Sequence, residues 1–234
     1  MLRSLSLTPE EWSAVILSVK VALWCVLVTT VPGVAIGWVL ARKRFWGLIM
    51  VDAVVHLPLV LPPVVVGYVL LVALGRRGVV GRFIYETLGL EVAFTWRAAV
   101  IASAIMGFPL MVRAVRLGME LVDRRLEQAA RTLGASPGRV FVTITLPLAM
   151  PGILTGMVLS FARSLGEFGA TITFAGNIAG DTRTLPLAVF TYTQVPGGEG
   201  PAMRLVVLSV LLSLAALIVS ELLARRVKRM VEHG

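Results

Sequence analysis

Between two long apolar runs of this chain lies EQAARTLGASPGRVFVTITLP, residues 127–147. The stretch is polar, carries charges and is punctuated by glycine. It is longer than the connections of about 2–8 residues that usually join neighbouring helices in a bundle. It is also too short to build a core of its own, because chains below about 40 residues rarely fold alone. We therefore expect this segment to contact a partner outside the membrane.

Residue spacing in this region predicts two short helices joined by a turn. The first covers residues 126–133, and its apolar and small residues share one face: Leu126, Ala129, Ala130 and Leu133. Gly134 can end that helix as a left-handed residue, and Ser136 and Pro137 suit the start of a second helix over 137–144. Small residues let a partner surface approach closely. A helix resting on lipid headgroups would explain the basic residues, but not the recurring small residues and the turn.

The composition is that of a membrane protein. The chain has 234 residues, of which 57% are hydrophobic and 15% charged, and its mean hydropathy is +0.89. A soluble domain cannot hide that much apolar surface. The net charge of +9 would suggest nucleic acid in a soluble protein, but here the Lys and Arg clusters lie beside apolar segments. They indicate membrane orientation and contact with anionic lipid, and no nucleic-acid partner is expected.

Five segments are long enough to cross the hydrocarbon core, which takes about 20 mostly apolar residues. They are residues 13–41, 48–74, 97–119, 141–163 and 203–224. Glycine and proline pairs such as Pro62-Pro63 predict bends in several of them. The stretch 184–194 is apolar but too short to cross, which indicates a half-helix. The sequence predicts an all-α polytopic membrane protein, 1–234 forming one transmembrane domain, with five long spans plus this half-helix, or six spans if it is counted.

Basic residues predict the orientation, because cytoplasmic loops carry an excess of Lys and Arg. Clusters at 42–44, in the loop 120–140 and at 225–229 fall on one side if the N-terminus lies outside. The loop 75–97 is an exception, with four arginines on the other side that its two glutamates only partly offset. We expect an external N-terminus and a cytoplasmic C-terminus.

A second polar region is SFARSLGEFGATITFAGN, residues 160–177. Arg163 and Glu167 are four residues apart and could pair on one helix face. Ionisable groups at membrane depth usually face the bundle interior, another charge or a watery pathway. A capped helix end with a solvated ion pair would explain the same pattern. The candidate pathway or gate residues are Arg163, Ser164, Gly166, Glu167, Phe168, Gly169 and Thr171.

Other polar residues give weaker indications. Asp52 and His56 lie four apart, which favours a hydrogen-bonded structural pair over a proton relay. Arg113 and Arg116 lie near the inner end of a span, where long side chains snorkel; a positively charged vestibule for a leaving anion is the alternative. With two histidines and the single Cys25, neither a disulfide framework nor a clustered metal site is expected.

The spacing Ala129-Ala130, three residues, Gly134, nine residues, Ile144, one residue, Leu146-Pro147 resembles the EAA loop of ATP-binding-cassette importer permeases. In that family the loop inserts into a cleft on a separate ATPase subunit. The resemblance implies a cytoplasmic coupling loop over about 120–141. Its implied contact residues are Leu126, Glu127, Gln128, Ala129, Ala130, Leu133, Gly134, Ala135, Ser136 and Pro137. The glutamate of the family motif aligns with Gln128, and the acid stands one place earlier, at Glu127.

Residues 160–177, followed by DTRTLPLAVFTYTQVPGGE at 181–199, resemble the membrane subunit of molybdate importers. The run LGEFGA, 165–170, is similar to the molybdate and sulfate branch, and 181–199 favours molybdate. The resemblance implies a type I importer permease in the cell inner membrane that moves molybdate or tungstate by alternating access. It also implies a homodimer, two copies of a cytoplasmic ATPase that uses ATP and Mg, and an extracytoplasmic molybdate- or tungstate-binding protein.

The chain itself is expected to bind no cofactor and to catalyse no reaction. It lacks the G-x-x-x-x-G-K-[ST] phosphate loop and any recognisable set of catalytic or metal-ligating residues. Two other functions fit less well: a sulfate or thiosulfate permease of the same superfamily, and an anion channel that needs no ATPase.

Overall fold

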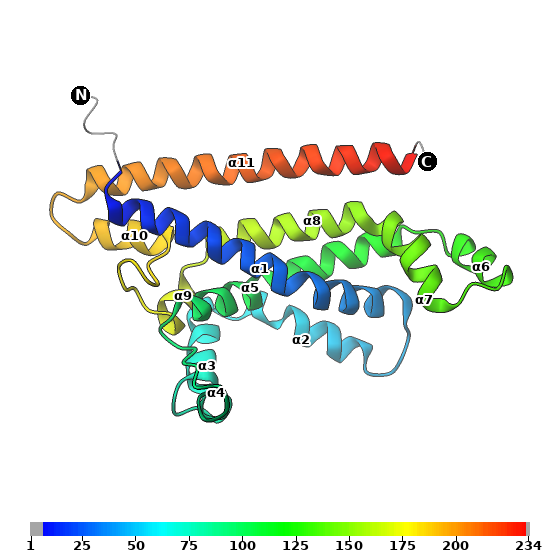
Figure 1. The fold of residues 1–234 in the computed structure, drawn as a ribbon, viewed down its shortest axis with the longest axis horizontal. Coiled ribbons are helices and arrows are strands. Elements are labelled where there is room, and N and C mark those ends of the chain that lie inside the picture. Colours follow the sequence, from blue (N-terminus) through cyan, green and yellow to red (C-terminus); the bar gives the residue numbers. More distant parts are fainter. Residues whose placement is uncertain (1–6, 233–234) are drawn as a thin grey trace.

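The computed structural model describes residues 7–232, with side chains described for residues 7–219 and 222. In this part of the chain every regular element is a helix (Figure 1). The elements are α1 (Pro9–Arg42), α2 (Leu48–Val60), α3 (Pro63–Leu74), α4 (Val79–Leu88), α5 (Trp96–Glu120), α6 (Arg124–Thr132), α7 (Pro137–Val140), a π-helical turn (Phe141–Thr145), α8 (Leu146–Leu165), α9 (Gly169–Phe174), α10 (Leu185–Thr193) and α11 (Glu199–Glu232).

Four continuous helical stretches are long and apolar enough to cross a membrane. They are Pro9–Arg42, Trp96–Glu120, Pro137–Leu165 and Glu199–Val219, and the bent pair α2–α3 would make a fifth. The predicted all-helical polytopic fold is confirmed. α10 has nine residues, as expected for a half-helix too short to span. The basic side chains at 225–229, which entered the orientation argument, lie outside the described side chains.

The predicted span 48–74 is not one straight helix. The chain bends by 111° between α2 and α3. Leu61 precedes Pro62 and adopts an extended conformation, with φ −71° and ψ 142°, because a residue before proline avoids the α region. Pro62 and Pro63 then start α3, since neither has an N–H to continue the helix before it. The proline pair predicted a bend, but not its size.

Helix α5 forms the centre of the bundle and packs between α1 and α8. The close approach of α5 and α8 depends on two glycines, because a methyl group added to Gly152 would lie 2.6 Å from the Gly118 Cα. Small residues are the usual means by which membrane helices bring their backbones together. Aliphatic and Met side chains fill the remaining space around the contact, among them Met111, Val115 and Ile153.

Replacing Gly152 by leucine should therefore destabilise the bundle. Overpacking of this kind costs about 1–3 kcal/mol, and here the obstructing atoms are backbone. We expect a clearly lower unfolding temperature for the purified chain in detergent. Gly200→Leu is the matched control, because a methyl group at Gly200 meets no atom within 4 Å. Equal unfolding temperatures for the two variants would contradict this account of the α5–α8 contact.

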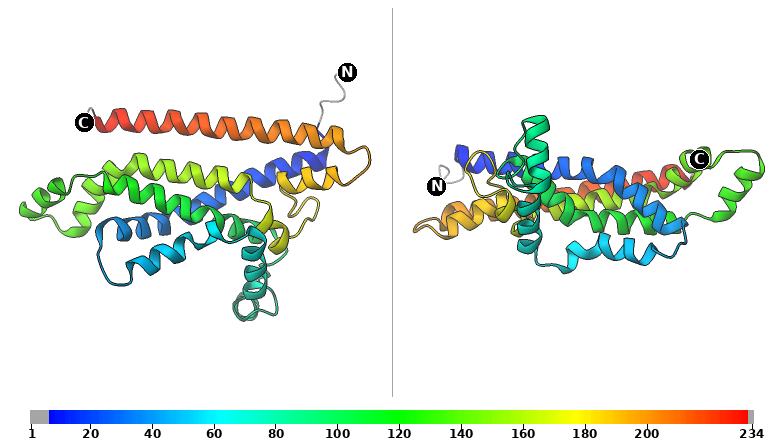
Figure 2. Two further views of the ribbon diagram at one scale, coloured as in Figure 1. Left: turned by 180° about the vertical axis from the view of Figure 1, so that it is seen from behind. Right: turned by 90° about the horizontal axis from the view of Figure 1, so that it is seen from below.

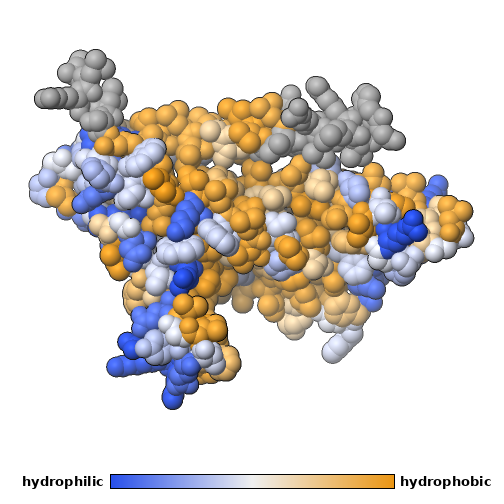
Figure 3. Space-filling model, viewed as in Figure 1, coloured by the Kyte–Doolittle hydropathy of each residue, from blue (hydrophilic) through white to orange (hydrophobic). Residues whose placement is uncertain are grey.

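The long helices run along one axis, and the polar segments lie at its two ends. α6 and α7 lie at one end, while α9, α10 and the beginning of α1 lie toward the other (Figure 1). Views from behind and from below agree, with α3 and α4 running across the axis (Figure 2). Apolar residues cover the middle of the surface, and hydrophilic residues gather at the ends and over α4 (Figure 3). The two candidate regions thus lie at opposite ends of α8.

Candidate functional site

The loop between α5 and α8 contains the two short helices that its spacing predicts. The Asp123 side chain caps α6 by accepting a hydrogen bond from the Arg125 N–H at 2.9 Å, so this helix begins two residues earlier than expected. Gly134 follows it with φ +87°, a left-handed conformation that is costly for residues with a Cβ. Ser136 Oγ accepts from the Arg139 N–H at 3.4 Å, which caps α7.

The second short helix is not separate from the span that follows. α7 ends at Val140, and the chain continues through the π-helical turn into α8, so that Pro137–Leu165 is one helical stretch. The predicted second helix, 137–144, therefore begins where expected but continues into the span instead of ending near residue 144. Pro147 has no N–H for the carbonyl of Thr143, and its ring crowds that carbonyl. The preceding turn widens, and the Leu146 N–H donates to Phe141 O, five residues back.

Most of the predicted contact residues of the loop are exposed. Leu126 is 49% exposed and Leu133 is 88% exposed. Gln128, Ala129, Gly134, Ser136 and Pro137 are also exposed, whereas Ala130 and Ala135 are half-buried. The loop therefore presents two large apolar side chains and a set of small ones at its surface. Such a surface suits a protein partner better than water.

Glu127 differs from the rest of the predicted set because its side chain is buried. Its Oε1 lies 3.0 Å from Arg42 Nη2 and accepts a hydrogen bond of 2.7 Å from Thr145 Oγ1. Arg42 Nη2 also donates to Val122 O at 3.0 Å, and Arg124 Nη2 donates to Ala41 O at 3.3 Å. These contacts join α6 to the end of α1 and to the π-helical turn before α8. Glu127 thus binds within the chain rather than facing outward.

Sequence reasoning missed the two partners of Glu127. It counted Arg42 only as an orientation charge, and Thr145 is the unspecified residue between Ile144 and Leu146. No local spacing connects Arg42 with Glu127, because the contact depends on how α1 ends beside α6.

At the other end of α8, the predicted pair of Arg163 and Glu167 forms across a helix break. α8 ends at Leu165, and Gly166 follows as its cap. Arg163 Nη1 lies 2.6 Å from Glu167 Oε2, while Glu167 Oε1 accepts from the Ala170 N–H at 2.8 Å. The expectation of a pair on one helix face is corrected: Glu167 is past the end of α8 and is only 2% exposed. It connects α8 to the first turn of α9.

The remaining predicted pathway residues surround this break. Ser164 and Thr171 have buried hydroxyl oxygens with no hydrogen-bond partner among the described residues. The Phe168 ring lies 5.2 Å from that of Phe190 on α10, a residue that sequence reasoning missed. Gly169 packs so tightly that an added methyl group would lie 2.7 Å from Pro63 Cβ at the start of α3. Gly166 is exposed.

The Ser164 and Thr171 hydroxyls are the unusual feature of this region. Buried hydroxyls without partners are uncommon and call for an explanation such as a polar ligand.

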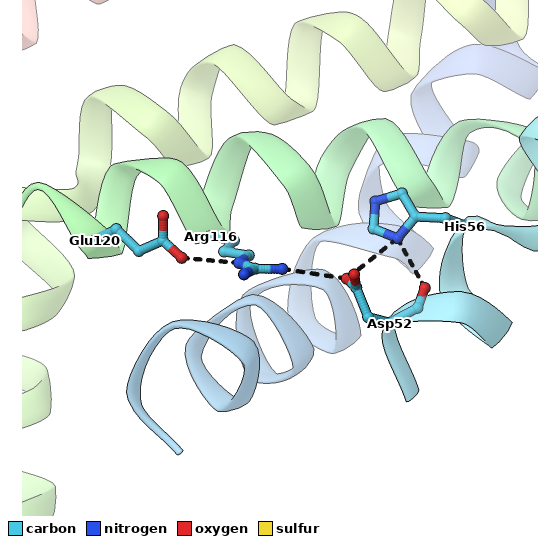
Figure 4. A network of polar contacts seen from close by, with 4 residues as sticks. All are labelled: Asp52, His56, Arg116 and Glu120. Carbon is cyan, nitrogen blue, oxygen red and sulfur yellow. Dashed lines mark hydrogen bonds and ion pairs between the residues drawn. The ribbon is translucent and has the colours of Figure 1, made fainter. Parts of the chain in front are cut away.

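A third polar group joins α2 to α5 (Figure 4). His56 Nδ1 lies 2.9 Å from Asp52 O and 3.4 Å from Asp52 Oδ1, which agrees with the predicted structural pair. Arg116 Nη1 lies 3.3 Å from Asp52 Oδ1, and Arg116 Nε donates to Glu120 Oε1 at 2.8 Å. We expected the Arg116 side chain to snorkel toward the membrane surface. It is instead paired, because the carboxylates of Asp52 and Glu120 both lie within its reach. A hollow of about 360 Å³ beside this group is also lined by Arg113.

Comparison with known proteins identifies the class of protein. Residues 33–229 match the family described as "Binding-protein-dependent transport system inner membrane component". The chain belongs to this family. As an inner-membrane component of such a transport system it is multi-pass and is not itself catalytic, and ATP is used by a separate ATPase.

Two relatives of this inner membrane component match over nearly their whole length. The "Molybdenum transport system permease protein ModB" of Escherichia coli (strain K12) is 58% identical over 219 residues, which cover 94% of this chain and 96% of that protein. The protein of the same description from Haemophilus influenzae is 53% identical over 224 residues, or 96% of this chain and 98% of that protein.

Solved structures share the fold of this inner membrane component at low sequence identity. A bacterial alginate ABC transporter in complex with a pentasaccharide-bound periplasmic protein gives a TM-score of 0.75 at 15% identity, covering 94% of this chain and 80% of that one. The MetNI methionine ABC transporter in an inward-facing conformation gives a TM-score of 0.66 at 16% identity, covering 93% of this chain and 94% of that one. These matches confirm the predicted fold of an ABC importer membrane subunit.

Proposed function

We propose that this chain is the permease subunit of a molybdate importer and moves molybdate or tungstate across the inner membrane by alternating access. The observation that carries the proposal is the near full-length similarity to two molybdenum transport permeases. The test is uptake of labelled molybdate by cells whose own permease gene is replaced by this one. Uptake that excess tungstate suppresses and excess sulfate does not would support the proposal. The reverse pattern would indicate a sulfate or thiosulfate permease. Uptake into vesicles that contain only the purified chain, without nucleotide, would indicate a channel.

We further propose one permease domain over 1–234 that forms a homodimer, with two ATPase copies and an extracytoplasmic binding protein. The loop 120–141 would face the cytoplasm, with the N-terminus outside and the C-terminus inside. Three observations support the cytoplasmic position of the loop. The loop lies at one end of an apolar belt, it exposes apolar side chains, and Arg42 and Lys43 lie beside it.

In this proposal the exposed face of α6 and the Gly134 turn dock into the ATPase. Gly134→Trp should then reduce substrate-stimulated ATP hydrolysis several-fold, because it adds bulk to the docking surface and strains a left-handed position. Gly134→Asn is the matched control, since asparagine tolerates this conformation and adds little volume. The measurement is ATPase activity of the reconstituted complex with loaded binding protein. A helix that only rests on lipid would leave both variants at the wild-type rate.

The region around Glu167 would form part of the anion pathway at the outer end. The buried Ser164 and Thr171 hydroxyls are neutral donors, and the positive charge of Arg163 is balanced by Glu167. A transported dianion must be released again. Weak binding by neutral donors serves release better than a permanent positive charge would.

A further inference from the structure

A basic hollow lies between the end of α1 and the loop that carries α6 and α7. It has a volume of about 270 Å³. Four cationic side chains contribute to its wall: Arg42, Lys43, Arg124 and Arg131. Glu127 is the only acid among the lining residues that the structure describes, and its carboxylate is paired with Arg42 at 3.0 Å. The other three cations therefore leave the hollow strongly positive.

An apolar groove of about 540 Å³ adjoins this hollow and shares three of its wall residues, Trp38, Pro137 and Phe141. From there the groove follows the outer face of α1 along Val31, Val34, Ala35 and Val39. Val31 is 75% exposed. The groove thus runs from the charged end of the molecule into the apolar belt.

Aromatic side chains mark the boundary between the two parts. Trp38 packs edge-on against Phe141 with ring centroids 5.8 Å apart, and Lys43 Nζ lies 5.3 Å from the Trp38 ring centroid. Tryptophan is enriched where a membrane meets water, because its ring is apolar and its N–H is polar. From one end of the site to the other, the positive charge, the tryptophan and the apolar groove match in order the headgroup, the interfacial region and the acyl chain of a lipid.

We infer that the hollow and the groove together bind one anionic phospholipid, with the phosphate headgroup in the hollow and an acyl chain in the groove. Basic pockets between membrane helices are suited to anionic headgroups. The inference does not depend on which anion is transported. The lipid would lie against Arg42 and would hold the end of α1 and the loop together from the membrane side.

The experiment is native mass spectrometry of the purified full-length chain with added phosphatidylglycerol or phosphatidylcholine. We expect selective retention of phosphatidylglycerol. Lys43→Gln with Arg131→Gln should weaken this retention by roughly fivefold or more for each cation removed. The matched control is Arg77→Gln with Arg82→Gln, which removes the same charge from exposed residues at the α3–α4 end and should retain the lipid. The inference would be overturned if the wild-type chain retained both lipids equally. It would also be overturned if the control variant lost as much phosphatidylglycerol as the Lys43→Gln, Arg131→Gln variant.

Two further arms separate this ligand from other occupants. Ala35→Trp should block the groove and lower phosphatidylglycerol retention, while the wild-type chain should show no comparable binding of inorganic phosphate. Phosphate that binds as tightly as the lipid, and is unaffected by Ala35→Trp, would assign the hollow to a free anion. Efficient disulfide formation between two copies carrying Ala35→Cys would instead show that a second chain covers the groove. Either result would overturn the lipid assignment.

Discussion

Replacing Glu127 by alanine is expected to remove most transport while the chain still inserts into the membrane. The change leaves the Arg42 guanidinium buried without its carboxylate and the Thr145 hydroxyl without its acceptor. Loss of one partner from a buried pair costs about 3–5 kcal/mol locally. In the proposed mechanism α6 must move together with α1 and α8. Without Glu127, α6 keeps only the Arg124 hydrogen bond to Ala41 O as a link to α1 and loses its link to Thr145, so movement of the loop should reach the spans less effectively.

The informative measurement is the ratio of molybdate transported to ATP hydrolysed in proteoliposomes. A purely structural role would lower both quantities together through loss of folded protein, whereas a role in coupling lowers the ratio. Glu127→Gln keeps an oxygen acceptor for Thr145 and removes only the charge. Its ratio of transport to hydrolysis should therefore lie between those of the wild type and Glu127→Ala. Glu86→Ala, which removes a carboxylate from an exposed ion pair on α4, is the control and should keep the ratio. An unchanged ratio in Glu127→Ala would remove Glu127 from the coupling mechanism.

Features that depend on a few neighbouring residues were predictable from the sequence. The left-handed Gly134 and the Ser136 cap with Pro137 after it follow from backbone chemistry within one turn, and the structure has both. The short α10 also follows from the length of its apolar run. In each case the physical constraint is local, so the pattern is sufficient.

Features that depend on contacts between distant segments were not predictable. The inward direction of Glu127 depends on where α1 ends, and the pairing of Arg116 depends on how α2 packs beside α5. The 111° angle between α2 and α3 is also a matter of packing, because prolines permit a bend without setting its angle. The break after α8, where Gly166 caps the helix, is a further example. The sequence could not show that Glu167 would be buried beside the first turn of α9 and accept a hydrogen bond from it.

Glu167→Gln is expected to reduce the maximal rate of molybdate uptake by roughly 5- to 150-fold, the change that corresponds to about 1–3 kcal/mol. The amide can still accept the hydrogen bond from the Ala170 N–H, so the start of α9 should persist. Arg163, however, would lose the carboxylate that lies 2.6 Å from it and would present a full positive charge beside the unpartnered Ser164 and Thr171 hydroxyls. A dianion should then be held too tightly, which predicts a lower KM together with a lower maximal rate.

The neutral double variant separates this electrostatic explanation from a structural one. Arg163→Gln combined with Glu167→Gln removes both charges and should recover a substantial part of the maximal rate, because no unbalanced cation remains in the pathway. Glu86→Gln breaks an exposed pair of the same four-residue spacing and should leave uptake unchanged. Were the double variant as inactive as Glu167→Gln with both proteins fully inserted, anion trapping would be excluded. The Glu167 carboxylate would then act through the geometry of the break between α8 and α9.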